Sequence, residues 1–143
     1  MKKQFLNSIA MFLSPVIPML LACFFIVFID TITGRQAARK RGDEVNSRTT
    51  RLGLTSKLMI YFSIILMAYF TDYYILNEIT RNYVWFDYMF SRIWVSILIY
   101  IEWTSINENI KVIKGFSINE KAVELVKGLK ALVRELSSIK QNK

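Results

Sequence analysis

At 143 residues, the chain has room for one compact domain or for a few membrane-spanning helices with a short tail, and a second globular domain would not fit. Hydrophobic residues make up 53% of the sequence and are bunched into long runs, which indicates a protein whose solvent is a lipid bilayer. The formal net charge is +8, but the cations lie in two blocks, 35–57 and 111–143, and both blocks flank apolar runs. We therefore expect these cations to lie next to the membrane, and we expect no nucleic-acid partner.

The residues that most enzyme and metal sites need are missing from the sequence. Histidine is absent, and Cys23, the one cysteine, lies inside an apolar run. These facts exclude a disulfide framework and almost every metal site or catalytic arrangement that depends on histidine. A glycine-rich phosphate loop, a serine nucleophile elbow and closely paired carboxylates are absent as well. We therefore expect no enzyme activity and no cofactor, and Cys23 is expected to be a packing residue.

The first long apolar run extends from Ile9 to Ile29, enough to cross the ~30 Å hydrocarbon core of a bilayer. Pro15 and Pro18 each remove a backbone donor and clash with the preceding turn. The spanning helix is therefore expected either to kink at the prolines or to begin there, with residues 5–14 lying along the interface.

The N-terminus also resembles a secretory signal peptide, because Lys2 and Lys3 precede the apolar run. The run is longer than a usual signal core, contains prolines and reaches Asp30 without a small-x-small cleavage site. These features favour a retained membrane span over a cleaved signal.

The segment 31–57 is strongly basic, and we expect it to be a cytoplasmic loop. We expect Asp30 and Gly34 to fix where the loop begins, with Gly34 closing the preceding helix in a left-handed C-cap. Gly42-Asp43 predicts a turn, and a short basic helix on the lipid headgroups is expected within the loop. The loop cations that set the topology are Arg35, Arg39, Lys40, Arg41, Arg48, Arg51 and Lys57.

Two further apolar segments follow the basic loop. The second span is expected over 58–76, with tyrosines near its far end that are typical of an interface belt. A short linker without net charge then fits the outer face. The third span is expected over 84–103, and it begins with aromatic and polar residues before a clean apolar core at 93–101.

The distribution of lysine and arginine predicts the orientation. The first loop and the C-terminal tail are positive and the second loop is nearly neutral, so three spans place the N-terminus outside and the C-terminus inside. Lys2 and Lys3 argue mildly the other way. If the N-terminal segment is interfacial instead, two full spans remain and both termini lie inside.

The tail, 111–143, is expected to be a basic amphipathic helix. Ser117-Ile118-Asn119-Glu120 is a capping box, in which the serine hydroxyl and the glutamate satisfy each other's backbone donors. Apolar residues then recur in alternating steps of four and three, a heptad-like spacing that lasts for three repeats. A stripe this short favours packing within the protein or contact with a lipid surface over a true coiled coil. The expected packing positions are Ile118, Leu125, Leu129, Leu132 and Leu136.

Ionisable residues at the edges of the spans are the candidate functional residues. They are Asp72, Asp87, Arg92 and Glu102. Burying such a charge in hydrocarbon costs several kcal/mol, so each side chain is expected to face a helix partner, water or the interface. If several copies assemble, these groups would make contacts between subunits or line a wet lumen. Placement at the interface of a single copy is at least an equally good interpretation for Asp72 and Asp87, and it is the favoured one for Glu102.

The order of several short motifs resembles phage holin family 4, the toxin-secretion or phage-lysis holins. The motifs are Asp30-Thr31-Ile32-Thr33-Gly34, Ala37-Ala38, Ser47-Arg48, Arg51-Leu52-Gly53, Lys57, Glu102, Ser105-Ile106-Asn107-Glu108-Asn109 and Gly115-Phe116. The resemblance covers roughly residues 20–132. It implies a protein that accumulates in the bacterial inner membrane of the host, oligomerises and permeabilises that membrane on a timed signal.

We therefore expect an all-α membrane protein. Residues 1–110 would form the transmembrane region, with about three spans at 9–29, 58–76 and 84–103 and the first of them kinked by proline, and residues 111–143 would form a cytoplasmic amphipathic helix. The expected partners are the lipid bilayer, further copies of the chain, and a co-encoded cell-wall hydrolase or toxin that the lesion would release. Two alternatives are a non-lytic membrane anchor or scaffold, whose C-terminal helix recruits a cytoplasmic partner, and a regulated ion channel subunit.

Overall fold

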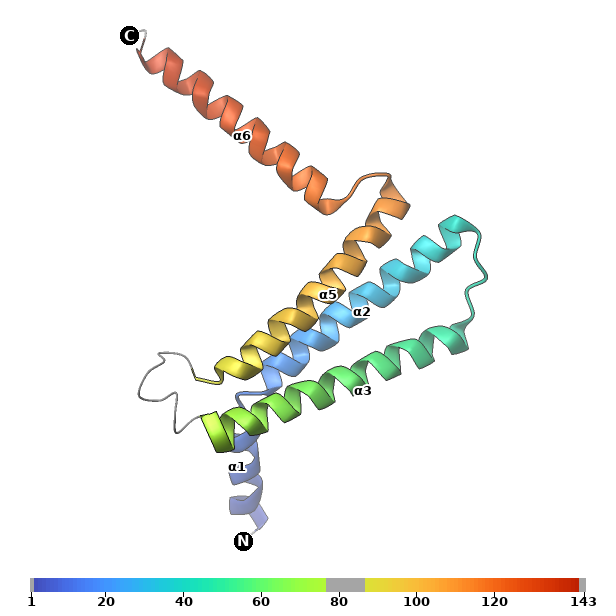
Figure 1. The fold of residues 1–143 in the computed structure, drawn as a ribbon, viewed down its shortest axis with the longest axis vertical. Coiled ribbons are helices and arrows are strands. Elements are labelled where there is room, and N and C mark those ends of the chain that lie inside the picture. Colours follow the sequence, from blue (N-terminus) through green and yellow to red (C-terminus); the bar gives the residue numbers. More distant parts are fainter. Residues whose placement is uncertain (1, 77–86, 142–143) are drawn as a thin grey trace.

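The computed structural model describes residues 2–76 and 87–141 (Figure 1). Over this part of the chain the structure is helical and contains no strand. The elements are α1 (Lys2–Leu13), α2 (Ile17–Arg41), α3 (Ser47–Thr71), the π-helical turn η1 (Asp72–Leu76), α5 (Met89–Lys114) and α6 (Ile118–Gln141). The predicted outer linker and the predicted start of the third span, residues 77–86, lie outside the described residues, as does the side chain of Leu136. The predicted all-α class is confirmed.

The two prolines end one helix and begin another. α1 stops at Leu13, the chain turns through residues 14–16, and Pro18 lies in the first turn of α2, where its missing N–H is not needed. The first span is therefore not a single kinked helix from Ile9 to Ile29. The alternative in which the long helix begins at the prolines agrees with these boundaries.

The predicted basic loop is mostly helical. α2 continues through Gly34 to Arg41, and it is Gly42, with φ of 85°, that forms the left-handed C-cap. Both the cap at Gly34 and the separate basic helix were wrong, because residues 35–41 are good helix formers and simply prolong α2. The predicted turn at Gly42-Asp43 is confirmed, and the side chain of Asn46 caps α3 by accepting from the Arg48 N–H at 2.8 Å.

α2, α3 and α5 form a three-helix bundle (Figure 1). α5 lies alongside α2 and runs in the same direction. α3 runs in the opposite direction, and it diverges from α2 toward the connection at 42–46. α1 lies at the opposite end of the bundle, and α6 projects away from it. The buried core joins the three helices near the α1 end and consists of Val16, Cys23, Ile65, Tyr69, Val95 and Leu98.

Much of the outer surface of the bundle is apolar, which is unusual for a water-soluble protein. Large apolar side chains point outward from all three helices, among them Phe25 (59% exposed), Met67 (71%) and Tyr100 (70%). Several ionisable side chains are buried instead, as described below. The helices Ile17–Arg41 and Ser47–Leu76 are long and apolar enough to cross a membrane; α5, which carries Arg92 and Glu102, is not one of these two.

Candidate functional site

Three charged residues, one from each helix of the bundle, meet at its centre. Lys57 of α3 places its Nζ atom 2.7 Å from Oδ2 of Asp30 on α2 and 3.0 Å from Oε2 of Glu102 on α5. A second contact to Glu102, at Oε1, is 3.2 Å long. We call Asp30, Lys57 and Glu102 the charge cluster. It links all three helices through a single ammonium group.

Neutral donors satisfy the remaining oxygens of the charge cluster. The Tyr61 hydroxyl donates to Oε1 of Glu102 at 2.6 Å, and Nδ2 of Asn109 donates to Oδ1 of Asp30 at 3.2 Å. Glu102 is 1% exposed and Asp30 6%, so both carboxylates are withdrawn from solvent. A buried carboxylate is tolerated only when it is paired and hydrogen-bonded, and here each has both kinds of partner. One cation nevertheless serves two carboxylates.

The charge cluster divides the bundle into an apolar half and a polar half. On one side lie the apolar residues of 17–29, 58–71 and 93–101, which surround the buried core. At ~1.5 Å per residue, the 17–29 segment is roughly 20 Å long. On the other side the helices carry the basic residues of the loop and of the end of α5.

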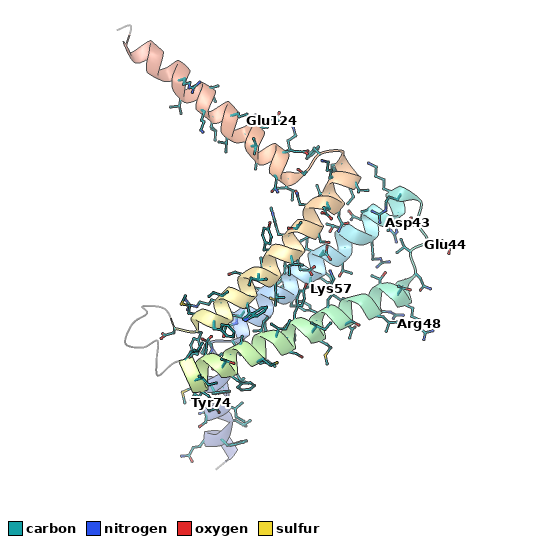
Figure 2. All side chains as sticks on the ribbon, in the orientation of Figure 1. Asp43, Glu44, Arg48, Lys57, Tyr74 and Glu124 are labelled. Atoms are coloured by element: carbon teal, nitrogen blue, oxygen red, sulfur yellow. The ribbon has the colours of Figure 1, made fainter. Side chains whose placement is uncertain are left out.

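That polar half ends in a concentration of positive charge. The cations lie where α2 ends, where α3 begins and where α5 ends, and they are Arg39, Lys40, Arg41, Arg48, Lys111 and Lys114. Figure 2 shows Arg48 at this end, together with Asp43 and Glu44. Lys40 donates to the backbone oxygen of Ile113 at 2.6 Å and Arg41 pairs with Asp43 at 3.0 Å, so part of this charge also holds the helix ends together.

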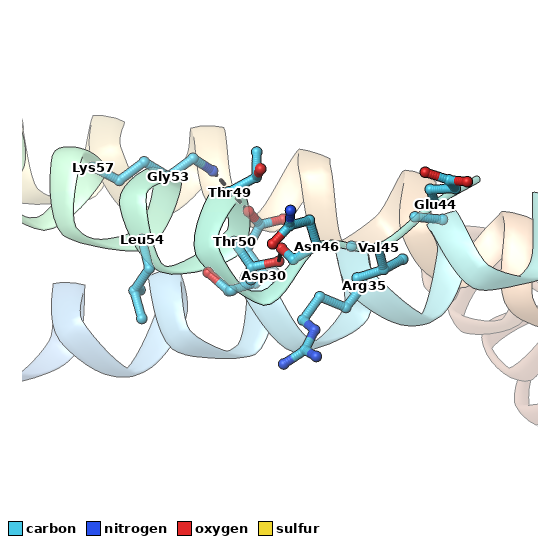
Figure 3. Close-up of a pocket in the computed structure, with 13 residues that line it drawn as sticks. Asp30, Arg35, Glu44, Val45, Asn46, Thr49, Thr50, Gly53, Leu54 and Lys57 are labelled. Carbon is cyan, nitrogen blue, oxygen red and sulfur yellow. Dashed lines mark hydrogen bonds and ion pairs between the residues drawn. The ribbon is translucent and has the colours of Figure 1, made fainter.

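A polar groove opens between α2 and α3 where the two helices diverge (Figure 3). Its volume is about 330 Å³, and it extends from Asp30 and Lys57 to Glu44 beside the connection. Between these ends the lining includes the polar side chains of Thr31, Asn46, Thr49 and Thr50 and the backbone at Gly34 and Gly53. The Nε atom of Arg35, which lines the groove, is buried and has no hydrogen-bond partner among the described residues.

Asp72 has a structural task at the apolar end of the bundle. Its Oδ2 atom accepts from the N–H of Ser91 at 2.7 Å and from the Ser91 hydroxyl at 2.5 Å, and its Oδ1 accepts from the N–H of Phe90 at 3.2 Å. Asp72 and Ser91 are both buried. The carboxylate therefore caps the start of α5, where free N–H groups and the positive end of the helix dipole favour an anion.

The sequence had grouped these ionisable residues differently. It assigned Lys57 to the topology of the loop and Asp72, Asp87, Arg92 and Glu102 to contacts between copies or to a lumen. The structure brings Lys57 and Glu102 together inside one chain and places Asp72 in a helix cap, while Asp87 and Arg92 are exposed at the start of α5. This arrangement within one chain does not test whether these residues also make contacts between copies or line a lumen.

Three residues of the site were missed from the sequence as functional positions. Tyr61, Asn109 and Ser91 all hydrogen-bond to the buried carboxylates. Asn109 closes the motif Ser105–Asn109, so its presence in an ordered set of motifs was a usable signal. Tyr61 and Ser91 lie in ordinary apolar stretches, and no local pattern distinguished them.

Comparison with known proteins gives one family. The model of the bacteriophage holin family matches residues 7–131, which include the whole charge cluster and most of α6. It is not a family of enzymes. Searches of curated proteins and of solved structures gave no match.

Proposed function

Because the chain belongs to the bacteriophage holin family, we propose that it inserts in the bacterial inner membrane as a multi-pass protein, oligomerises there and permeabilises the membrane, so that a cell-wall hydrolase or toxin leaves the cytoplasm. The observation that carries this proposal is the arrangement of side chains in the bundle: large apolar residues face outward while Asp30 and Glu102 are buried against Lys57. Such a surface is matched to lipid, and the buried charges are paired within the chain, as a charge inside a membrane must be.

We place three helices across the membrane, α2, α3 and α5. The basic end of the bundle then lies at the cytoplasmic surface and α1 at the outer one, as the excess of lysine and arginine inside favours. Arg92 is one turn into α5, where a long side chain extends to the outer headgroups. Glu102 lies deeper, where its carboxylate contacts Lys57, which also pairs with Asp30, and accepts from the Tyr61 hydroxyl.

The depth of the charge cluster gives it a role in this mechanism. The apolar segment of α2 before Asp30 is roughly 20 Å long, whereas the hydrocarbon core is ~30 Å thick, so the charge cluster lies below the cytoplasmic surface or the bilayer thins around it. While the cluster is satisfied within each chain, single copies are stable in the bilayer and accumulate. We propose that assembly turns the polar α2–α3 groove toward a lumen, with Asp87 and Arg92 near its outer mouth.

Asp72 and Glu102 act differently from our sequence-based expectation in this proposal. Their oxygens already accept hydrogen bonds within the chain, so they hold the helices of each copy in place and do not line the lumen themselves. The subunits associate through the outward apolar faces, where helix packing and polar contacts supply the driving force.

The test is induced expression of the full chain in bacteria carrying a membrane-potential dye, with and without a cytoplasmic cell-wall hydrolase. We expect abrupt depolarisation in both cultures and lysis only when the hydrolase is present. Membrane-inserted protein that causes neither depolarisation nor lysis would refute the proposal, and discrete, ion-selective conductances in a planar bilayer would favour a channel subunit instead.

A further inference from the structure

The apolar face of α6 is uncovered in the structure. Figure 1 shows this helix projecting away from the bundle, and the contacts that attach it lie in its first turn. Beyond that turn, the apolar side chains are more than half exposed or nearly so. They are Val123 (54%), Leu125 (68%), Val126 (50%), Leu129 (62%), Leu132 (57%) and Val133 (65%). A continuous apolar face of this kind indicates a binding surface.

The direction in which α6 leaves the bundle is built into the chain. Gly115, with φ of 83°, turns the backbone after α5, and Oδ1 of Asn107 accepts from the Ile118 N–H at 2.8 Å. The capping box then locks the first turn, because the Ser117 N–H donates to Glu120 at 2.9 Å and the Glu120 N–H donates to the Ser117 hydroxyl at 3.1 Å. α6 therefore begins at the basic end of the bundle, beside the cytoplasmic leaflet of the proposed topology.

Positive charge runs along one edge of the apolar face. Lys127, Lys130 and Arg134 follow one another at helical spacing, and Lys130 and Arg134 line the same surface hollow as Val126 and Val133. The two acidic residues of the first turns do not oppose this charge. Glu120 pairs with Lys111 at 3.0 Å and Glu124 pairs with Lys121 at 2.5 Å.

The pattern fits a lipid surface better than a second copy of the helix. A coiled coil needs a narrow seam with opposite charges beside it, and those flanking positions in α6 include Val126, Val133 and Gly128. The valines widen the apolar stripe instead. A broad stripe bordered by lysine and arginine is the pattern of a helix that lies in the membrane interface and is attracted by anionic lipids.

We propose that α6 lies on the anionic inner leaflet, with its leucines at the boundary between headgroups and acyl chains and its cationic edge among the lipid phosphates. In this arrangement α6 lies flat on the membrane surface beside its own bundle. It adds an affinity for acidic lipid that the spanning helices do not supply. It goes beyond membrane permeabilisation, because it assigns a lipid class to a surface outside the spans.

The test uses the full chain in lipid nanodiscs made either of phosphatidylcholine or of an equimolar mixture with phosphatidylglycerol. An environment-sensitive fluorophore is attached at Leu129→Cys, or at Ala131→Cys as the matched control on the opposite face, with Cys23→Ala in both. In the mixed lipid we expect the label at 129 to be blue-shifted, shielded from iodide and quenched by lipid-borne nitroxide, while the label at 131 stays accessible to iodide. The combined variant Lys127→Gln, Lys130→Gln and Arg134→Gln should remove most of the difference between the two lipids.

Two results would overturn the proposal. Equal access of iodide to the labels at 129 and 131 in the mixed lipid would show that α6 does not lie on the surface. Shielding at 129 without quenching by the lipid nitroxide, together with cross-linking of Leu129→Cys copies, would identify a second α6 as the occupant. Neither measurement requires lysis. A negative result for α6 can therefore be distinguished from a negative result for the proposed function.

Discussion

Replacing Lys57 with methionine should destabilise the bundle strongly, although the residue is partly exposed. Methionine is unbranched and one atom shorter than lysine, and the substitution removes the ammonium group that contacts Asp30 at 2.7 Å and Glu102 at 3.0 Å. Two carboxylates that are 6% and 1% exposed are then left together without a counter-charge. Removing one partner of a buried ion pair destabilises a protein by about 3 kcal/mol or more. We expect the lower value here because the Lys57 side chain is 41% exposed. Since each 1.4 kcal/mol is tenfold, the ratio of folded to unfolded protein should fall roughly 100-fold.

The measurement is SDS-driven unfolding of the full chain in mixed micelles, followed by tryptophan fluorescence, to which Trp94 and Trp103 on α5 contribute. Lys111→Met is the matched control. Its ion pair with Glu120 joins two exposed side chains, so its loss should leave the free energy of unfolding close to that of wild type.

A triple variant makes the reasoning refutable. With Lys57→Met, Asp30→Asn and Glu102→Gln combined, no uncompensated charge remains, and most of the lost stability should return. Two results would contradict the reasoning. Either Lys57→Met unfolds at the same SDS concentration as wild type and Lys111→Met, or the triple variant is no more stable than Lys57→Met alone. In both cases the charge cluster does not stabilise the bundle as the distances imply.

The remaining predictions use single positions. Asp72→Ala should lower the free energy of unfolding by about 2 kcal/mol in the same SDS titration, because the buried N–H and hydroxyl of its helix cap lose their acceptor; an unchanged midpoint would contradict the cap. Gly42→Ala should destabilise by about 1 kcal/mol because its φ is 85°, whereas Gly53→Ala, inside α3 with open space around it, should stabilise by roughly 0.5–1 kcal/mol, and equal effects would refute the conformational argument. The pKa of Glu120 is held below its usual value of 4.5, first by the Ser117 N–H, so the capping box is complete above pH 4.5 and is lost as the pH falls through the lowered value. The NMR shift of the Ser117 amide should report that acid transition, and Glu120→Gln should abolish it.

Features that depend on neighbouring residues were largely predictable. The capping box at Ser117–Glu120 and the turn at Gly42-Asp43 are present as expected, because each is made by groups within five residues of one another. The family was also recognised from the order of the motifs, and the match over residues 7–131 confirms it. The end of α2 was placed wrongly at Gly34. A glycine is compatible with both a cap and a helix interior, and the residues that follow it decide between them.

By itself, the sequence determined the helical class, the apolar segments, the basic end and the amphipathic pattern of α6, since all of these follow from composition and from spacing of a few residues along one chain. Only the tertiary structure decided which charges meet. Lys57 is 27 residues from Asp30 and 45 from Glu102, and nothing in the periodicity of three separate helices reveals that their side chains converge. The pairing is selected by burial, because a charge that cannot reach water is stable only where the packing of the helices brings it an opposite charge.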